Sequence, residues 1–355
     1  MTKGYSAGIG DLLRSSAAWR ALKNRFPSTD LHFLFFTKDP GYASEALISR
    51  HHLLKEFFVV DKRTKGLRDW GKFLNEIARV MDEVDPDLVI DFDPHGLRTS
   101  IVSLWMRVKY HVTTVGVNQF PFRRFFYSLY SASTKKFARD RRLEHPLEIT
   151  CRDFVALSAL GIERNCVPIE LEETPEGSAF RKKFKEKYGT QENEAILGVN
   201  IGCGTPDALH KRPNLTLLSK LVGYLQRKYN FTVVLTGAKF EKDINVEFID
   251  LLGKSANYPV YDLAGETDLL ELVGLIRGCN MFISTDSGPY HMAVALRVPT
   301  LAIFNEDSRI HLHSHPWVSC SLLRNEEHID RLIKEAERLW NSRVISSETK
   351  LTKQK

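Results

Sequence analysis

Hydrophobic and polar residues follow one another along this chain in blocks that predict strands and helices in alternation. Short apolar runs, such as residues 31–36 and 195–201, are typical of buried strands. Longer stretches with apolar residues at helical spacing, such as residues 215–228, predict amphipathic helices. Strands are predicted at residues 31–36, 57–60, 88–92, 112–117, 195–201, 231–235, 258–263, 281–283 and 300–304. Helices are predicted at residues 12–26, 42–49, 70–84, 97–107, 123–160, 180–188, 215–228, 244–252, 268–278, 291–296 and 329–340.

This alternation predicts an α/β protein with parallel, doubly wound sheets. A polar break with proline and glycine at residues 171–177 separates two such series. We therefore expect two Rossmann-like domains, at residues 1–172 and 173–326. A closing amphipathic helix at residues 327–345 and a disordered tail at residues 346–355 follow.

Composition is consistent with two domains of ordinary size. The chain has 355 residues, of which 43% are hydrophobic and 26% charged, as in globular proteins. No apolar run approaches the roughly 18 residues of a membrane span, and no signal peptide is evident, so we expect a cytoplasmic protein and a monomer. The five cysteines are scattered without any CxxC pair, which indicates reduced thiols rather than a zinc or disulfide framework.

Positive charge is concentrated between Phe120 and Arg142. The seven basic residues of this segment are Arg123, Arg124, Lys135, Lys136, Arg139, Arg141 and Arg142, against the single acid Asp140. The excess equals the net charge of the whole chain, +6. Aromatic residues interleave with the basic ones, so the segment is either a solvated face over packed rings or a surface for an anionic acceptor or membrane leaflet. No nucleic-acid-binding motif accompanies it, so we expect no nucleic acid partner.

Residues 281–304 read as strand, tight turn, short helix, loop and strand. Asp286 or Ser287 can cap the helix, and Pro289 suits its first turn because no N–H is needed there. Free backbone N–H groups and the positive end of a helix dipole then lie at the carboxyl end of a strand, an arrangement that favours phosphate.

Two further turns contain candidate functional residues. Gly202 and Gly204 follow a predicted strand, and their backbone can approach a diphosphate, with the Thr205 hydroxyl and the Lys211 charge nearby. The other turn, Gly8-Ile9-Gly10-Asp11, precedes the first helix, which Asp11 would cap.

The run TDSGPYHMAVALRVPTLAIF at residues 285–304 resembles the C-terminal signature of glycosyltransferase family 9, the ADP-heptose:lipopolysaccharide heptosyltransferases. The shared features are Asp-Ser-Gly, a histidine three positions after the glycine, an alanine-rich helix and Pro-Thr before a strand. The Gly10-Asp11 turn and the glycine loop at residues 202–205 match the family in the same order. The resemblance implies the GT-B architecture, two Rossmann-like domains facing a cleft.

The resemblance also implies an activity. It is inverting, metal-independent transfer of a heptose or related sugar from a nucleotide-diphosphate sugar, expected to be ADP-heptose, with no cofactor. The acceptor would be a lipopolysaccharide core or similar anionic glycolipid, met through the basic segment at the cytoplasmic face of the inner membrane. Asp11 maps onto the proposed general base. The residues that would hold the diphosphate are Gly202, Gly204, Thr205, Lys211, Ser287, Gly288 and His291, and those that would serve the nucleoside are Glu241 and Asp286.

One departure from the family bears on activity. Family members carry an apolar strand directly before the Gly-Asp turn, whereas this chain has MTKGYSA, so we expect the first strand of the N-terminal domain to be missing. One alternative is therefore a nucleotide-sugar-binding protein without transferase activity.

Another alternative is a metal-dependent glycosyltransferase that uses the DxD pair Asp91 and Asp93. His311, His313 and His315 lack a cysteine or carboxylate at ligand spacing, so they predict a surface loop rather than a zinc site.

Overall fold

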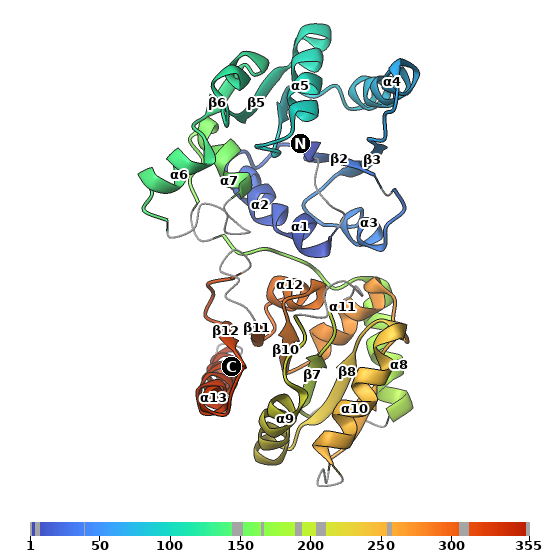
Figure 1. Ribbon diagram of the computed structural model, residues 1–355, viewed down its shortest axis with the longest axis vertical. Helices are drawn as coiled ribbons and strands as arrows, with labels where there is room; N and C mark the ends of the chain where they lie inside the picture. The colour runs from blue at the N-terminus through green and yellow to red at the C-terminus, as the bar shows by residue number, and fades with distance from the viewer. Residues whose placement is uncertain are drawn as a thin grey trace. The chain divides into compact units, whose positions relative to one another are not determined.

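The computed structural model describes residues 2–3, 8–38, 40–143, 152–164, 167–188, 194–203, 211–253, 258–304 and 312–352 (Figure 1). The chain divides into two compact units, Met1–Ile169 and Glu170–Lys355. The division lies close to the boundary expected after residue 172. We call the two parts unit 1 and unit 2.

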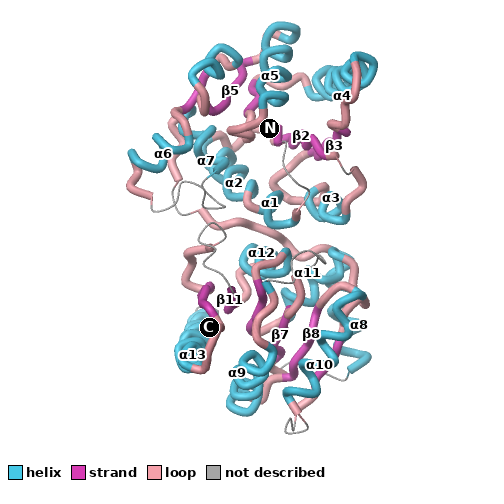
Figure 2. Tube along the Cα trace, viewed as in Figure 1, coloured by secondary structure: helices cyan, strands magenta, loops and turns pink. Residues whose placement is uncertain are grey.

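Unit 2 is built on one six-stranded sheet in which every pairing is parallel. Figure 2 shows strands of this sheet in magenta with helices in cyan around them. Its strands are β7 (Ile196–Asn200), β8 (Thr232–Thr236), β9 (Val260–Asp262), β10 (Met281–Thr285), β11 (Thr300–Phe304) and β12 (Val318–Leu322). The spatial order is β12-β11-β10-β7-β8-β9, so β7 lies at the centre between β8 and β10. This is the doubly wound Rossmann order, with the direction of winding reversing between β7 and β10.

Helices cover both faces of this sheet. On one face α9 (Leu215–Tyr229), α10 (Lys242–Leu252) and α13 (Glu327–Thr352) pack with the strands into one apolar core. The remaining helices are α8 (Pro175–Tyr188), α11 (Leu269–Gly278) and α12 (Gly288–Ala295). A Cβ added to Gly177 of α8 would lie 2.7 Å from the backbone nitrogen of Gly274, so these two helices touch through glycine.

Unit 1 has two three-stranded parallel sheets, β1-β2-β3 and β4-β5-β6. Its strands are β1 (Thr2–Lys3), β2 (His32–Thr37), β3 (Glu56–Asp61), β4 (Leu88–Ile90), β5 (Thr113–Val117) and β6 (Leu129–Ser131). The expectation of a missing first strand is wrong for the described residues, because β1 pairs with β2 opposite Leu34 and Phe35. It is only two residues long, and it pairs with β2 alone among the described strands.

The helices of unit 1 also lie on two sides of the strands. One side carries α4 (Leu67–Val84) and α5 (Leu97–Tyr110), whose apolar residues form a core with β2 and β4. The shorter helices are α1 (Ile9–Leu13), α2 (Ser15–Arg25), α3 (Ala43–Ile48), α6 (Thr134–Asp140) and α7 (Arg152–Leu157), with 3-10 turns η1 (Pro121–Phe126) and η2 (Ser158–Leu160). Trp19 of α2 is completely buried and packs against Phe33 of β2, with ring centroids 5.2 Å apart.

The structure corrects three predictions of secondary structure. Within the described parts of residues 123–160, which exclude 144–151, the expected long helix is replaced by η1, β6, α6, α7 and η2. A new helix begins after Ser133, whose hydroxyl accepts the Lys136 N–H as an N-cap. Strand β12 was not predicted, and α13 continues to Thr352, beyond the helix end expected at residue 345.

Candidate functional site

Most of the predicted donor-binding residues gather at the carboxyl edge of the unit 2 sheet. The loops that follow β7, β8 and β10 leave neighbouring strands there, because β7 pairs with both others. The edge between β7 and β10 is where the winding reverses, and in open α/β sheets this is the position where ligands bind.

The Glu241 carboxylate holds the first of these loops to the second. One of its oxygens accepts the Cys203 N–H at 2.8 Å and the other accepts the Ala238 N–H at 2.8 Å. Glu241 is 2% exposed, so these hydrogen bonds are buried. A Cβ on Gly202 would lie 1.8 Å from Glu241 Oε1, so glycine is required for the carboxylate to reach the loop.

The third loop is tied to the first by side-chain hydroxyls. Thr285 Oγ1 donates to the Gly202 carbonyl at 2.5 Å, and Ser287 Oγ donates to Asn200 Oδ1 at 3.0 Å. Asn200 ends β7 and its amide also donates to Thr236 of β8. Neither Thr285 nor Asn200 is among the site residues predicted from the sequence. A polar residue at the end of an apolar strand is the signal that could have found them, and both are buried.

Helix α12 begins directly at this edge. Ser287 is its N-cap residue in extended conformation, Gly288 is its first residue and Pro289 lies in the first turn, as the sequence predicted. The Ser287 hydroxyl does not cap the helix but bonds to Asn200, so it does not occupy the backbone N–H groups of the first turn. These groups and the helix dipole favour an anion.

A cation lies beside the same helix end. Lys211 Nζ is 2.8 Å from Asp286 Oδ2 and 3.3 Å from the Asp286 carbonyl oxygen. The Asp286 side chain is 8% exposed and that of Lys211 is 32% exposed, so the lysine is the solvent-facing partner. An arriving anion therefore meets a lysine that is already held in position.

His291 is buried in α12 and contacts a second histidine. Its Nδ1 lies 2.9 Å from Nε2 of His313, which is 5% exposed. The prediction that residues 311–315 form a surface loop is therefore wrong for His313, whereas His311 lies outside the described residues. The Tyr290 hydroxyl accepts the His313 N–H at 3.2 Å and fixes this contact from the neighbouring turn.

Two predicted donor contacts, Gly204 and Thr205, lie outside the described residues. Cys203, the last described residue before them, is half-buried. Desolvation raises the pKa of its thiol, and the negative charge of Glu241 raises it further. A protonated thiol adds no charge to the edge where we expect the diphosphate.

Asp11, the predicted base, lies in unit 1. It is not an N-cap as predicted, because α1 already begins at Ile9 and places Asp11 in its first turn. Its carboxylate lies 3.1 Å from Arg14 Nη1 and its side chain is 30% exposed. Arg14 is buried, with its Nε 3.9 Å from Asp153, and Ser15 Oγ donates to the same Asp153 carboxylate at 2.5 Å. A buried ionic cluster thus orients a partly exposed carboxylate.

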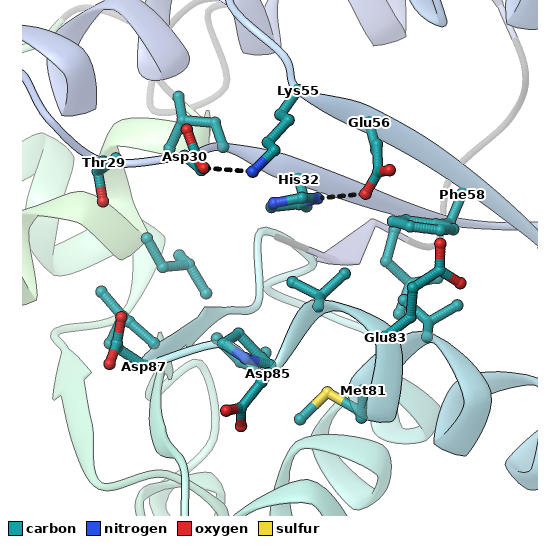
Figure 3. A pocket seen from close by; sticks show the side chains of 18 of the residues that line it. Thr29, Asp30, His32, Lys55, Glu56, Phe58, Met81, Glu83, Asp85 and Asp87 are labelled. Carbon is teal, nitrogen blue, oxygen red and sulfur yellow. Dashed lines mark hydrogen bonds and ion pairs between the residues drawn. The ribbon is translucent and has the colours of Figure 1, made fainter.

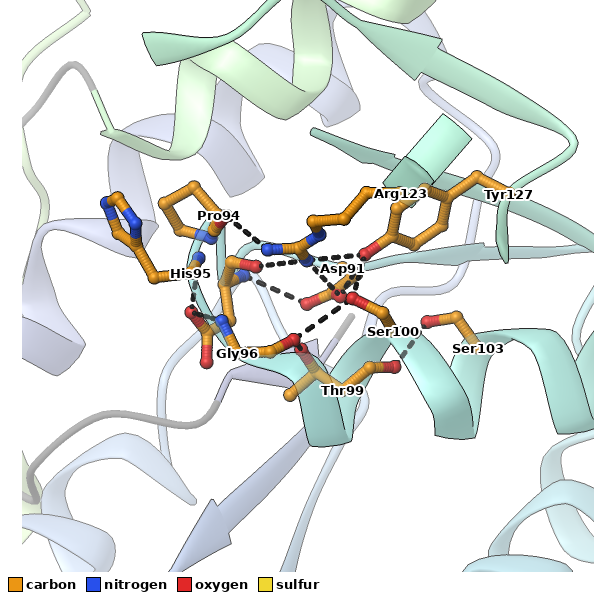
Figure 4. Close-up of polar contacts among 10 residues, drawn as sticks. Asp91, Pro94, His95, Gly96, Thr99, Ser100, Ser103, Arg123 and Tyr127 are labelled. Atoms are coloured by element: carbon orange, nitrogen blue, oxygen red, sulfur yellow. Dashed lines mark hydrogen bonds and ion pairs between the residues drawn. The ribbon is translucent and has the colours of Figure 1, made fainter. Parts of the chain in front are cut away.

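The DxD pair has a structural role in unit 1 (Figure 4). Asp91 is completely buried, accepts the Tyr127 hydroxyl at 2.7 Å and lies 3.6 Å from the Arg123 guanidinium. Asp93 Oδ1 accepts the backbone N–H groups of His95 and Gly96. Both carboxylates are therefore engaged in holding the loop after β4, which disfavours the metal-dependent alternative.

Burial, together with the nearby Asp93 carboxylate, raises the pKa of Asp91 to about 7. The hydrogen bond from Tyr127 and the charge of Arg123 oppose this rise. Among the described residues, no group of three or more His, Cys, Asp or Glu side chains is placed to hold a metal ion.

The basic segment is only partly a surface. Arg123 is 1% exposed and its guanidinium also donates to Asp93 O, so its inclusion in a surface patch was wrong. Tyr127 and Phe137 are buried, whereas Phe120, Phe122 and Phe125 are exposed. Arg124 lies over the Phe125 ring at 4.8 Å and is exposed. The exposed part is thus a smaller patch of rings and cations.

Comparison with known proteins agrees with this geometry. The sequence profile described as "Glycosyltransferase family 9 (heptosyltransferase)" matches residues 218–331. This region contains the β10–α12 turn and Glu241, whereas Lys211 and the loop after β7 lie outside it. Over these residues, about a third of the chain, the sequence is similar to glycosyltransferase family 9.

Individual relatives of the family differ in how much of the chain they match. Lipooligosaccharide heptosyltransferase 2 of Campylobacter jejuni is 28% identical over 138 residues, which are 39% of this chain and 41% of that protein. The match thus spans about two fifths of this relative. Lipopolysaccharide heptosyltransferase 3 of Escherichia coli is 21% identical over 313 residues, 87% of this chain and 82% of that protein.

Solved structures of the family share the fold over the whole chain. A family 9 glycosyltransferase from Veillonella parvula has a TM-score of 0.71 at 20% identity, covering 96% of this chain and 97% of its own. The Escherichia coli ADP-heptose heptosyltransferase II has a TM-score of 0.67 at 18% identity, covering 96% and 98%. This confirms the GT-B fold class, with two Rossmann-like units. Within the described residues, no helix is long and apolar enough to cross a bilayer.

Proposed function

We propose that this protein is an inverting, metal-independent glycosyltransferase of family 9. It moves a heptose or related sugar from a nucleotide-diphosphate sugar, ADP-heptose by our assignment, to a lipopolysaccharide core or similar anionic glycolipid. The observation that carries the proposal is the carboxyl edge of unit 2. There the N-terminus of α12 and the Lys211–Asp286 pair lie beside a loop that Glu241 holds in place.

The diphosphate would be bound by Lys211, His291 and the backbone N–H groups at Gly288. Gly202, Gly204, Thr205 and Ser287 complete the proposed set of phosphate contacts. Glu241 and Asp286 are assigned to the nucleoside. A carboxylate has about four lone-pair positions, so the two N–H groups that Glu241 accepts leave acceptor capacity for ribose hydroxyls.

In the proposed reaction the acceptor hydroxyl attacks the anomeric carbon of the donor sugar. Asp11 takes the hydroxyl proton as the new C–O bond forms, and the bond from the sugar to the diphosphate breaks on the opposite face. The diphosphate leaves with an added negative charge, which Lys211 and the α12 N-terminus stabilise. Arg14, at 3.1 Å from the Asp11 carboxylate, orients the base.

The acceptor is proposed to reach unit 1 from a membrane surface. Phe120, Phe122 and Phe125 are exposed, and Lys135 and Lys136 on α6 are exposed close by in sequence. Aromatic rings enter the headgroup region while cations attract anionic lipids. We therefore propose a monomer that associates peripherally with the cytoplasmic face of the inner membrane.

Transfer from ADP-heptose to a lipopolysaccharide core acceptor tests the proposal, with donor binding measured separately. We expect Lys211→Ala to weaken donor binding, because a charge that faces the diphosphate is lost. We expect Asp11→Asn to lower kcat by roughly 10²- to 10⁴-fold while the donor Kd stays unchanged. Lys220→Ala, an exposed lysine of α9 paired with Glu326, is the control and should change neither value.

Two outcomes would favour the alternatives. Donor binding without transfer to any core acceptor would identify a binding protein that has lost catalysis. Activity that EDTA abolishes and that Asp11→Asn leaves intact would instead indicate a metal-dependent enzyme.

A further inference from the structure

Two histidines of unit 2 form a buried pair at the first turn of α12. His291 is the fourth residue of α12 and is 6% exposed, and His313, which follows β11 in the chain, is 5% exposed. His291 Nδ1 lies 2.9 Å from His313 Nε2, and the planes of the two rings are 80° apart. At this separation one of the two nitrogens donates an N–H and the other accepts it.

His313 is held in place by contacts besides the one with its partner ring. Its backbone N–H donates to the Tyr290 hydroxyl at 3.2 Å, and the two rings lie 5.3 Å apart. Tyr290 is completely buried, and its hydroxyl lies 3.3 Å from Cys320 Sγ of β12. Further along the same segment, the indole N–H of Trp317 donates to the Val294 carbonyl of α12 at 3.1 Å. The segment that carries His313 is therefore fixed to α12 at two points.

Two other titratable groups lie close to His313. Burial is the largest cause that raises the pKa of the Tyr290 hydroxyl and of the Cys320 thiol. The negative charge of Asp286 raises both pKa values further, and that charge is paired with Lys211 at 2.8 Å. Both groups therefore keep their protons near neutral pH and do not take a proton from His313.

The direction of the hydrogen bond between the two rings decides how His291 can meet an anion. A neutral imidazole has one N–H, so an Nδ1 that accepts leaves the proton on Nε2, whereas an Nδ1 that donates leaves Nε2 with a lone pair. The oxygens of a diphosphate accept hydrogen bonds. A neutral His291 therefore donates to a diphosphate only when His313 is the donor within the pair.

His32 of unit 1 provides the opposite case (Figure 3). It lines a cavity of about 670 Å³, and its Nδ1 lies 3.0 Å from the Glu56 carboxylate. An ionised carboxylate only accepts, so the proton of this ring belongs on Nδ1. The partner of His291 is a ring that can donate or accept, so the partner sets the proton position.

We propose that His313 is a positioning residue for the sugar transfer. Its Nε2–H donates to His291 Nδ1 and so holds the His291 proton on Nε2, the nitrogen that donates to the diphosphate. This inference rests on the proposed function, which assigns His291 to the diphosphate. As the bond from the sugar to the diphosphate breaks, the diphosphate gains negative charge and the hydrogen bond from His291 becomes stronger.

Nitrogen NMR of the full chain with isotope-labelled histidine tests the proton position without any donor. At about pH 8, above the ordinary histidine pKa, we expect His291 to carry its proton on Nε2 with Nδ1 bare. His32 should show the reverse and serves as an internal reference. The His291 signals are assigned by their loss in His291→Ala. In His313→Leu, a mixture of the two proton positions should replace the single form.

Substitutions at His313 test its role in transfer. His313→Leu removes the N–H donor and should lower kcat by roughly 10- to 100-fold, with a smaller change in donor Kd, because the diphosphate is most negative in the transition state. His313→Gln places an amide N–H near the position of Nε2 and should restore kcat to within about threefold of the original value. His315→Gln is the control, a change of the neighbouring histidine whose ring stacks on Trp317, and it should leave kcat unchanged.

A double-mutant cycle separates positioning from a role in folding. In the His291→Ala protein, His313→Leu should lower kcat by less than about twofold, because the residue through which it acts is gone. A proton on His291 Nδ1 in the original protein would overturn the inference. Equal losses for His313→Gln and His313→Leu, or an undiminished loss in the His291→Ala background, would overturn it as well. If the original protein transfers no sugar, the proposed function fails, while the nitrogen spectra still decide the proton position.

Discussion

Unit 2 and unit 1 have the same strand order, but their central strands differ greatly in length and pairing. In unit 2 the five residues of β7 are buried and pair with β8 and β10, and the loops that leave these strands are joined by Glu241, Thr285 and Ser287. In unit 1 the two-residue β1 leaves the sheet in two parts. The difference suggests that a continuous centre is what lets three loops hold a fixed binding edge.

The polar groups at the carboxyl edges of the two units reflect this difference. In unit 2 the edge presents a solvent-facing lysine and a helix N-terminus, whereas in unit 1 Asp91 and Asp93 are engaged inside the protein by Tyr127, Arg123 and the loop backbone. One edge is where we propose that the donor binds, whereas the polar groups of the other edge hold their own loop. The predictions below test this contrast, from the largest expected effect to the smallest.

Replacing Gly202 by valine should disrupt the edge of unit 2 most strongly. The Cβ would lie 1.8 Å from Glu241 Oε1, so the loop and the carboxylate must separate. We expect donor affinity to fall by about two orders of magnitude, corresponding to loss of charge-assisted hydrogen bonds worth roughly 1.5–3 kcal/mol each. Gly71→Ala, which adds a methyl group to open space in α4, is the control, and a comparable loss there would contradict the prediction.

Amide exchange should show that the two centres differ in local stability. We expect the Val199 amide in β7 to exchange about 10³-fold more slowly than the Ile90 amide, because β7 is paired on both sides. Hydrogen exchange measured at single-residue resolution gives the two rates to be compared. Equal protection would mean that unit 1 is as cooperative at its centre as unit 2.

The stability of unit 1 should fall with rising pH in a window set by Asp91. A carboxyl whose folded pKa is raised stabilises the fold fully below its unfolded pKa, and this contribution is lost as pH rises through the folded value. For Asp91 the window runs from about pH 4 to the folded pKa of about 7. The steepest slope is about 1.4 kcal/mol per pH unit.

Denaturant unfolding of Asp91→Asn across this window tests the assignment. The variant keeps the size of the side chain and removes its titration, so its stability curve should be flatter than that of the original protein. A slope that the substitution leaves unchanged would assign the pH dependence to another group. Signals from unit 2, such as Trp340, should not follow the change.

The smallest effect is expected at the exposed ring patch of unit 1. Phe125 is 65% exposed, so Phe125→Ser should leave folding intact and reduce binding to anionic vesicles by a few-fold through lost apolar burial. Phe240→Ser, an exposed ring of unit 2, is the control. Equal loss from both substitutions would show that general hydrophobicity, and not this patch, governs vesicle binding.

Much of the fold could be predicted from local pattern. Apolar runs such as those that form β7 and β10 are long enough to be recognised, and the Asp286–Pro289 turn has the residues its geometry needs. The three residues of β6 could not be recognised in the same way, because Leu129–Ser131 is too short for an apolar run and forms a strand only by pairing with β5. Local sequence therefore predicts the helices and strands whose own residues favour that conformation.

Side-chain burial was harder to predict than secondary structure. Arg123 lies within a basic, aromatic run and is nevertheless buried, because Asp91 at the end of β4 supplies its counter-charge. His313 is buried where it forms hydrogen bonds with His291 and Tyr290. Each partner is distant in sequence, so only the tertiary structure brings the pair together.

The glycine contact between α8 and α11 bears on which substitutions the chain tolerates. A Cβ on Gly274 would lie 1.9 Å from the Gly177 carbonyl oxygen, so neither position admits even a methyl group unless the helices move apart. Alanine would stabilise each helix taken alone, but its methyl group would push the two helices apart. Since α11 also packs against α12, a larger residue at this distant crossing would change the position of the helix whose N-terminus we propose as part of the donor site.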